Sequence, residues 1–156
     1  MMRKFLIAIL VAASLSQASA QSIDIRDAFK QMPDSLMPYL SKNNRLDFID
    51  FLDSGMKAEV KNALGGTSEM LSIASDSLSI RMSDGLHVDM IAMDSTLVMI
   101  ETFTVDSLYG ESRVHYYSAD WHPVATPVLT ESQQRRIRSL ELQNIVKRDD
   151  ELLKKR

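Results

Sequence analysis

The fold is decided by residues 69–117, which read EMLSIASDSLSIRMSDGLHVDMIAMDSTLVMIETFTVDSLYGESRVHYY. Apolar side chains recur at every second position, and turn-forming pairs such as Asp76-Ser77 and Asp94-Ser95 separate the apolar runs. The connections are too short for parallel crossovers, which need about a dozen residues. The stretch therefore predicts an antiparallel meander. The positions expected to face the core are Leu71/Ile73, Leu78/Ile80/Met82, Leu86/Val88/Met90, Leu97/Met99/Phe103/Val105 and Val114/Tyr116.

Two short helices are expected before the meander. The first spans Ser22–Met32, with Ser22 as a cap, because its apolar residues follow the spacing of one helical face. The second runs from Asn44 to Ser54, and Gly55 follows where a left-handed residue commonly ends a helix. Pro33 and Pro38 bracket a turn or a single helical turn between them.

The segment Met56–Leu64 is ambiguous, since its alternation favours a strand and its composition favours a helix. A strand is the preferred interpretation. Sheet and helices together predict an α+β fold, in which two N-terminal helices pack on an antiparallel meander of five or six strands.

A charged C-terminal helix is expected after the sheet. Pro123 and Pro127 end the strand pattern, and the sequence from Thr130 to Gln133 has the form of a capping box. We expect residues 1–20 to be a signal peptide, residues 21–129 a single α+β domain and residues 130–156 a charged helical tail.

The first twenty residues have the pattern of a secretory signal. Arg3 and Lys4 precede an apolar run of about nine residues, too short for a bilayer-spanning helix, which needs about 20. Ala18-Ser19-Ala20 is a small-x-small cleavage site, so we expect cleavage after Ala20 and a periplasmic or secreted protein. No later segment is apolar enough to be transmembrane, and the chain contains no cysteine.

Charge is divided unevenly along the chain. Gln21–Leu129 contains 8 lysines and arginines against 16 acidic residues, whereas Thr130–Arg156 contains 8 against 5. An acidic body repels phosphate backbones, so nucleic acid is not an expected partner.

The densest aromatic segment is the candidate for a ligand or partner site. Its residues are Tyr116, Tyr117, Asp120, Trp121 and His122. Their rings could stack on a sugar or peptide at the edge of the sheet, or they could close the end of the core with Trp121 as a plug.

No catalytic residue, metal site or cofactor is predicted. His87, His115 and His122 lack the spacing of helical or strand zinc ligands, and the Asp-Ser pairs are explained as turn formers rather than calcium ligands. The serines occur in none of the usual nucleophile motifs.

A series of short motifs follows the chain in a fixed order: Phe29-x-x-Met32-Pro33-Asp34, Leu36-x-Pro38-x-Leu40, Arg45-Leu46-Asp47-Phe48-Ile49-Asp50-Phe51, Ser54-Gly55-Met56, Asn62-x-Leu64-Gly65-Gly66 and Tyr117-Ser118-x-Asp120-Trp121. In these motifs the chain resembles a family of uncharacterised exported proteins of Bacteroidales bacteria, the domain of unknown function numbered 3256. The resemblance covers about residues 21–125 and implies an envelope location, but no activity and no site residues.

Two functions compete at this level, and a third possibility is that the C-terminal helix docks a partner chain or self-associates. The favoured hypothesis is a non-enzymatic envelope module that binds a protein, peptide or glycan near Tyr116–Trp121. The alternative is a periplasmic hydrolase of peptides or glycans in which Asp120, His115 or His122 acts as general acid or base.

Overall fold

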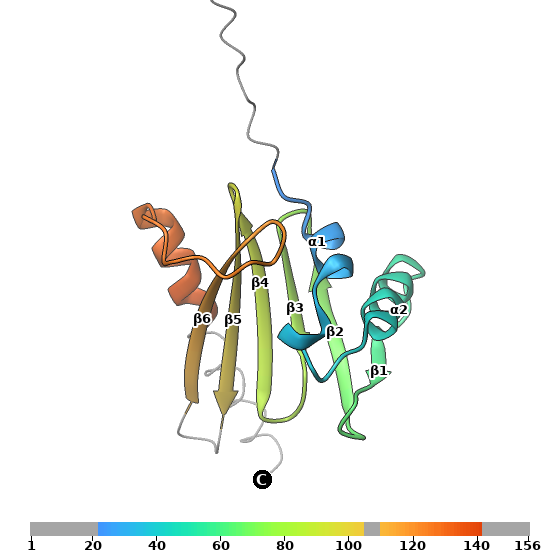
Figure 1. The fold of residues 1–156 in the computed structure, drawn as a ribbon. Coiled ribbons are helices and arrows are strands. Elements are labelled where there is room, and N and C mark those ends of the chain that lie inside the picture. Colours follow the sequence, from blue (N-terminus) through green and yellow to red (C-terminus); the bar gives the residue numbers. More distant parts are fainter. Residues whose placement is uncertain (1–21, 105–109, 142–156) are drawn as a thin grey trace, which may run out of the picture.

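Six antiparallel strands form one sheet in the order of the sequence, as the alternating pattern predicts (Figure 1). The structure, a computed structural model, describes residues 22–104 and 110–141. The strands are β1 (Glu59–Lys61), β2 (Thr67–Ile73), β3 (Ser77–Arg81), β4 (Leu86–Met93), β5 (Thr96–Thr104) and β6 (Gly110–Ser118). The α+β meander is therefore confirmed, and Met56–Leu64 contributes a short strand rather than a helix.

The expected alternation fails in β2. A bulge between Met70 and Ser72 inserts one residue into the pairing with β3. Met70 is consequently buried, while Leu71 is 46% exposed and Ile73 is only partly buried. The prediction that Leu71 faces the core was wrong, because strict period-two counting does not detect an extra residue.

The two N-terminal helices begin at different residues from those expected. α1 (Ile25–Gln31) is capped by Asp24, not by Ser22, since the Asp24 carboxylate accepts hydrogen bonds from the Arg26 and Asp27 amides at 2.8 and 3.2 Å. α2 (Lys42–Asp53) starts at a capping box that Ser41 forms with Asn44. Gly55 follows with φ of +67°, the left-handed conformation that was predicted.

Between the helices, a single 3₁₀ turn, η1 (Asp34–Leu36), occupies the proline-bracketed segment. α1, η1 and α2 lie together at the β1–β3 side of the sheet (Figure 1). We call the sheet surface beneath them the first face. Its core includes Phe29 and Phe48 from the helices and Ile80, Met90 and Met99 from the strands.

A buried cation holds this helical layer together. The Arg45 side chain in α2 is 1% exposed. Its guanidinium donates hydrogen bonds to the backbone carbonyls of Phe29, Met32 and Leu40 at 3.1, 2.5 and 3.0 Å, and forms an ion pair with Asp34 at 2.8 Å. One side chain thus fixes the C-terminal end of α1 and the η1 loop against α2.

The opposite surface, the second face, is also partly buried. Residues 131–141 form a helix within the expected tail of residues 130–156, and residues 142–156 lie outside the described residues. Ile137 of this helix packs with Ile91, Val98 and Ile100. Thr130 and Gln133 form the predicted capping box, with the Thr130 amide donating to Gln133 Oε1 at 2.9 Å.

Val114 and Tyr116 face this second layer, not the first core where they were expected. Tyr117 pairs with Leu97 on the first face, so the alternation of β6 places its neighbour Tyr116 on the other side. That expectation was wrong because it considered one buried face only.

Ile137→Ala tests whether the C-terminal helix belongs to the same cooperative unit as the sheet. Removing a buried isoleucine side chain costs about 2–4 kcal/mol when the site is part of the packed core. We expect a loss of this size in urea unfolding followed by circular dichroism, with the exposed neighbour Arg138→Ala as control. Equal stability of the two variants would separate the helix from the domain.

Candidate functional site

Two of the five expected site residues lie in the core. Tyr117 and Trp121 are both buried, with ring centroids 5.5 Å apart. Trp121 Nε1 donates a hydrogen bond to the Ala28 carbonyl of α1 at 2.9 Å. Trp121 also has a positive φ of 62°. These two rings therefore close the core between β6 and α1 and are not available as a stacking surface.

The other three residues lie apart. Tyr116 packs on the second face, where burial is the main cause of its raised pKa and Glu141 contributes less. Asp120 and His122 are exposed in the turn after β6. The structure thus does not gather the aromatic segment into one site.

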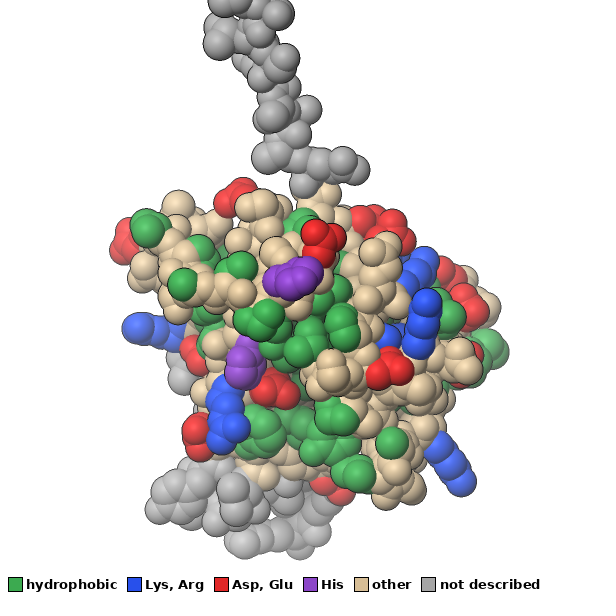
Figure 2. All heavy atoms as spheres, viewed as in Figure 1, with side chains coloured by type: hydrophobic (Ala, Val, Ile, Leu, Met, Phe, Trp, Pro, Cys, Tyr) green, Lys and Arg blue, Asp and Glu red, His purple; other side chains and the backbone are tan. Residues whose placement is uncertain are grey.

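A mixed charged and aromatic surface lies instead on the first face of β5 and β6. We define the β5–β6 patch as Glu101, Phe103, Arg113 and His115. Glu101 is directly opposite Arg113 in the ladder, and His115 is opposite Met99 on the same face. α1 and α2 lie at the β1–β3 side of the sheet (Figure 1), and Figure 2 shows basic, acidic and histidine side chains beside apolar ones over β5 and β6.

The patch is held by side-chain contacts within the sheet. His115 Nε2 lies 3.2 Å from Glu101 Oε2, with the two side chains 42% and 24% exposed. The Arg113 guanidinium lies 5.2 Å from the centroid of the Phe103 ring, at cation–π distance. The Glu101 charge also acts on the buried Tyr117. Burial is the main cause of the raised pKa of Tyr117, and the negative charge of Glu101 raises it further.

A second polar cluster lies on the second face of β3 and β4. Ser79 Oγ is 2.8 Å from His87 Nε2, and Asp89 Oδ1 is 3.5 Å from the same nitrogen. In a hydrolytic triad the hydroxyl and the carboxylate contact different ring nitrogens. This cluster therefore lacks triad geometry. Sequence reasoning missed it, although the spacing of His87 and Asp89 places both on one strand face.

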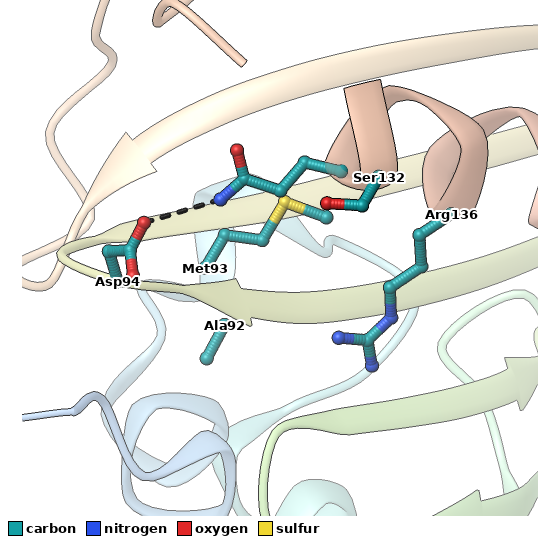
Figure 3. A pocket seen from close by; sticks show the side chains of 6 residues that line it. Ala92, Met93, Asp94, Ser132 and Arg136 are labelled. Atoms are coloured by element: carbon teal, nitrogen blue, oxygen red, sulfur yellow. Dashed lines mark hydrogen bonds between the residues drawn. The ribbon is translucent and has the colours of Figure 1, made fainter. Parts of the chain in front are cut away.

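A small pocket separates the C-terminal helix from the β4–β5 turn (Figure 3). Its volume is about 280 Å³, and Gln133 Nε2 donates to Asp94 Oδ2 across it at 3.2 Å. Arg136, which also lines it, is 2.8 Å from Asp76 Oδ2. The polar groups of the pocket thus bond to the protein itself, and they anchor the helix to two turns of the sheet.

Within the described residues, no three histidine, aspartate or glutamate side chains are placed to share a metal ion. None of the described helices is long and apolar enough to cross a membrane.

Most of the chain matches one known protein family. Residues 17–151 match the family described as "Protein of unknown function (DUF3256)". The chain belongs to this family. The DUF3256 match continues past Thr130 and so includes the C-terminal helix, beyond the segment of about residues 21–125 that carried the resemblance in the sequence.

The family assignment does not come with a relative of known function. No curated protein matches the chain. A solved structure, described as a domain of an uncharacterized protein from Porphyromonas gingivalis W83, matches with a TM-score of 0.50 and 21% identity. The match covers 74% of this chain and 67% of that one, and it shows a shared fold alone.

Trp121→Phe tests the closing role of the indole. The variant keeps an aromatic ring but removes the donor to the Ala28 carbonyl, which costs about 1–2 kcal/mol. We expect that loss in urea unfolding. Tyr117→Phe is the matched control, expected to change the stability by less than about 0.5 kcal/mol, since no described residue hydrogen-bonds to its hydroxyl. Equal losses in both variants would contradict the assigned role of the indole N–H.

Asp76 offers a pH test of how the C-terminal helix is anchored. Its hydrogen bond from Arg136 is the main cause of a pKa below the ordinary value of 3.8. A lowered pKa stabilises the fold above that ordinary value, and the contribution disappears as the pH falls through the folded-state pKa.

We expect Arg136→Gln to raise the Asp76 pKa toward 3.8 in a ¹³C NMR titration of the carboxyl carbons. Arg135→Gln, whose side chain faces Glu131 instead, should leave the titration of Asp76 unchanged. An unchanged Asp76 pKa in the Arg136 variant would contradict the contact.

Proposed function

We propose that this protein is a non-enzymatic binding module of the cell envelope and that the β5–β6 patch contacts a protein partner. The observation that carries the proposal is the Arg113–Phe103 stack beside the Glu101–His115 pair, on a strand surface that neither α1 nor α2 covers. Arginine and aromatic residues are enriched at protein interfaces, where they supply a large share of the binding energy.

Charge supports a protein or peptide partner over nucleic acid. Gln21–Leu129 contains 8 basic residues and 16 acidic ones, and this excess of negative charge disfavours binding to a phosphate backbone. The patch itself presents both signs of charge, so it suits a partner with its own mixed charges rather than a uniformly charged polymer.

The pattern of the first twenty residues supports the proposed location. The basic, apolar and small-residue parts of the first twenty residues follow the order of a secretory signal, and the absence of cysteine is compatible with any redox compartment. We therefore place the proposed interaction in the periplasm or outside the cell.

Site-directed photocrosslinking tests the proposal. Phe103 is replaced by p-benzoylphenylalanine, which keeps an aromatic ring in the patch. The same substitution at Leu71, an exposed apolar residue on β2, is the control. In cells that naturally make the protein, we expect a discrete adduct with a second protein from position 103 and none from position 71.

Arg113→Ala in the same background should reduce the adduct, because it removes the stack on the crosslinking ring. Identical adducts from both positions, or no adduct from position 103, would contradict the proposed surface.

A hydrolase of peptides or glycans is the second candidate, favoured by the carboxylate–histidine contact of Glu101 and His115 at 3.2 Å. Both groups lie on an open strand surface, which excludes little water from a reaction. His115→Asn should abolish hydrolysis of envelope peptides or glycans if the pair is catalytic. Retention of partner crosslinking in that variant, with no hydrolysis by the unaltered protein, supports the binding module instead.

A further inference from the structure

β6 is a long edge strand, and only its C-terminal half is covered by described residues. It is last in the sheet order and spans Gly110–Ser118 (Figure 1). The chain folds back over its end, where the Ser118 amide donates to the His122 carbonyl and the Val124 amide donates to the Tyr116 carbonyl, both at 2.9 Å.

These two bonds show which backbone groups of β6 point away from its neighbour β5, toward the open edge. The N–H and C=O groups of alternate residues point to the same side of a strand. Since Tyr116 and Ser118 bond outward, Ser112 and Val114 also direct their backbone groups outward, and no bond joins these groups to the described residues. The other edge differs, because β1 has only three residues and the side-chain amide of Asn44, Nδ2, donates to the Lys61 carbonyl at 3.4 Å.

The charges along this edge are self-complementary in one register only. If two β6 strands pair antiparallel with Ser112 opposite Ser112, Glu111 of each copy lies opposite Arg113 of the other. Pairing centred on Arg113 would oppose two arginines. Pairing centred on Val114 would require the backbone groups of Tyr116, which the fold-back already occupies.

We propose that the β6 edge binds a second copy of this chain in that register, which joins the two sheets about a two-fold axis at Ser112. Glu111 and Arg113 are well exposed, and Arg113 Nε lies 3.8 Å from Glu111 Oε1 within one chain. Both side chains are therefore accessible to form ion pairs with the second copy instead. Because the pairing involves few residues, it buries far less surface than the roughly 1,000 Å² or more that is typical of stable complexes. The dimer is therefore weak and depends on concentration.

This inference is independent of the proposed function, although Arg113 belongs to both surfaces. Photocrosslinking distinguishes the two proposals, since self-association produces an adduct of twice the chain mass and a different partner protein produces an adduct of another mass. Failure of either proposal leaves the other standing.

Sedimentation equilibrium of the purified protein over a wide concentration range tests the dimer. Glu111→Arg places like charges opposite each other and should weaken association at least tenfold, whereas Glu111→Arg combined with Arg113→Glu restores opposite charges and should recover it. Circular dichroism checks that each variant folds. A monomer at all concentrations, or equal association of all three proteins, would overturn the proposal.

Disulfide trapping provides a second test, because the chain contains no cysteine. Directly opposite residues in a hydrogen-bonded antiparallel pair have Cα atoms about 5.5 Å apart, within disulfide range. Ser112→Cys should form a covalent dimer on mild oxidation much faster than Ser118→Cys, a position beside the fold-back on the same strand. Equal rates would contradict the register.

Discussion

The buried guanidinium of Arg45 is the constraint on which the arrangement of the helices depends. A charge in the core is costly unless hydrogen bonds replace its hydration. Arg45 meets this requirement with three backbone carbonyls, which come from the end of α1 and from the loop after it. Two of them, those of Phe29 and Met32, lie at the C-terminal end of α1, where carbonyls lack the regular α-helical donor four residues further on. The helices therefore pack on the sheet as one layer, because a side chain of α2 satisfies carbonyls of α1 and of the loop between the helices.

The position of that layer decides which part of the sheet stays open. α1, η1 and α2 lie at the β1–β3 side (Figure 1). Trp121 connects the end of β6 to α1 through its hydrogen bond to the Ala28 carbonyl. The C-terminal helix covers part of the second face through Ile137. Among the described residues, a strip of the first face on β5 and β6 and the N-terminal half of the β6 edge lie outside both of these helical layers. Both proposed surfaces occupy this strip.

Local sequence patterns predicted much of the fold, because hairpins, the Thr130–Gln133 capping box and the left-handed Gly55 depend on neighbouring residues. The β2 bulge was missed because it depends on how β2 pairs with β3. Arg45 was also missed, since a basic residue in an amphipathic helix looks like part of the solvated face. The aromatic segment was divided for a simple reason: Tyr116 and Tyr117 are adjacent in a strand and must face opposite sides. The contact of Glu101 with His115 required the register of β5 with β6, which sequence alone did not provide.

The stability of Arg45→Lys measures the central claim most directly. Lysine keeps the positive charge and most of the aliphatic stem but lacks the planar fork that reaches three carbonyls at once. Arg26→Lys is the matched control, because Arg26 is partly exposed and pairs with the exposed Asp53. In urea unfolding, the account predicts a loss of about 2–4 kcal/mol for Arg45→Lys and less than about 0.5 kcal/mol for Arg26→Lys. Equal stability of the two variants would contradict it.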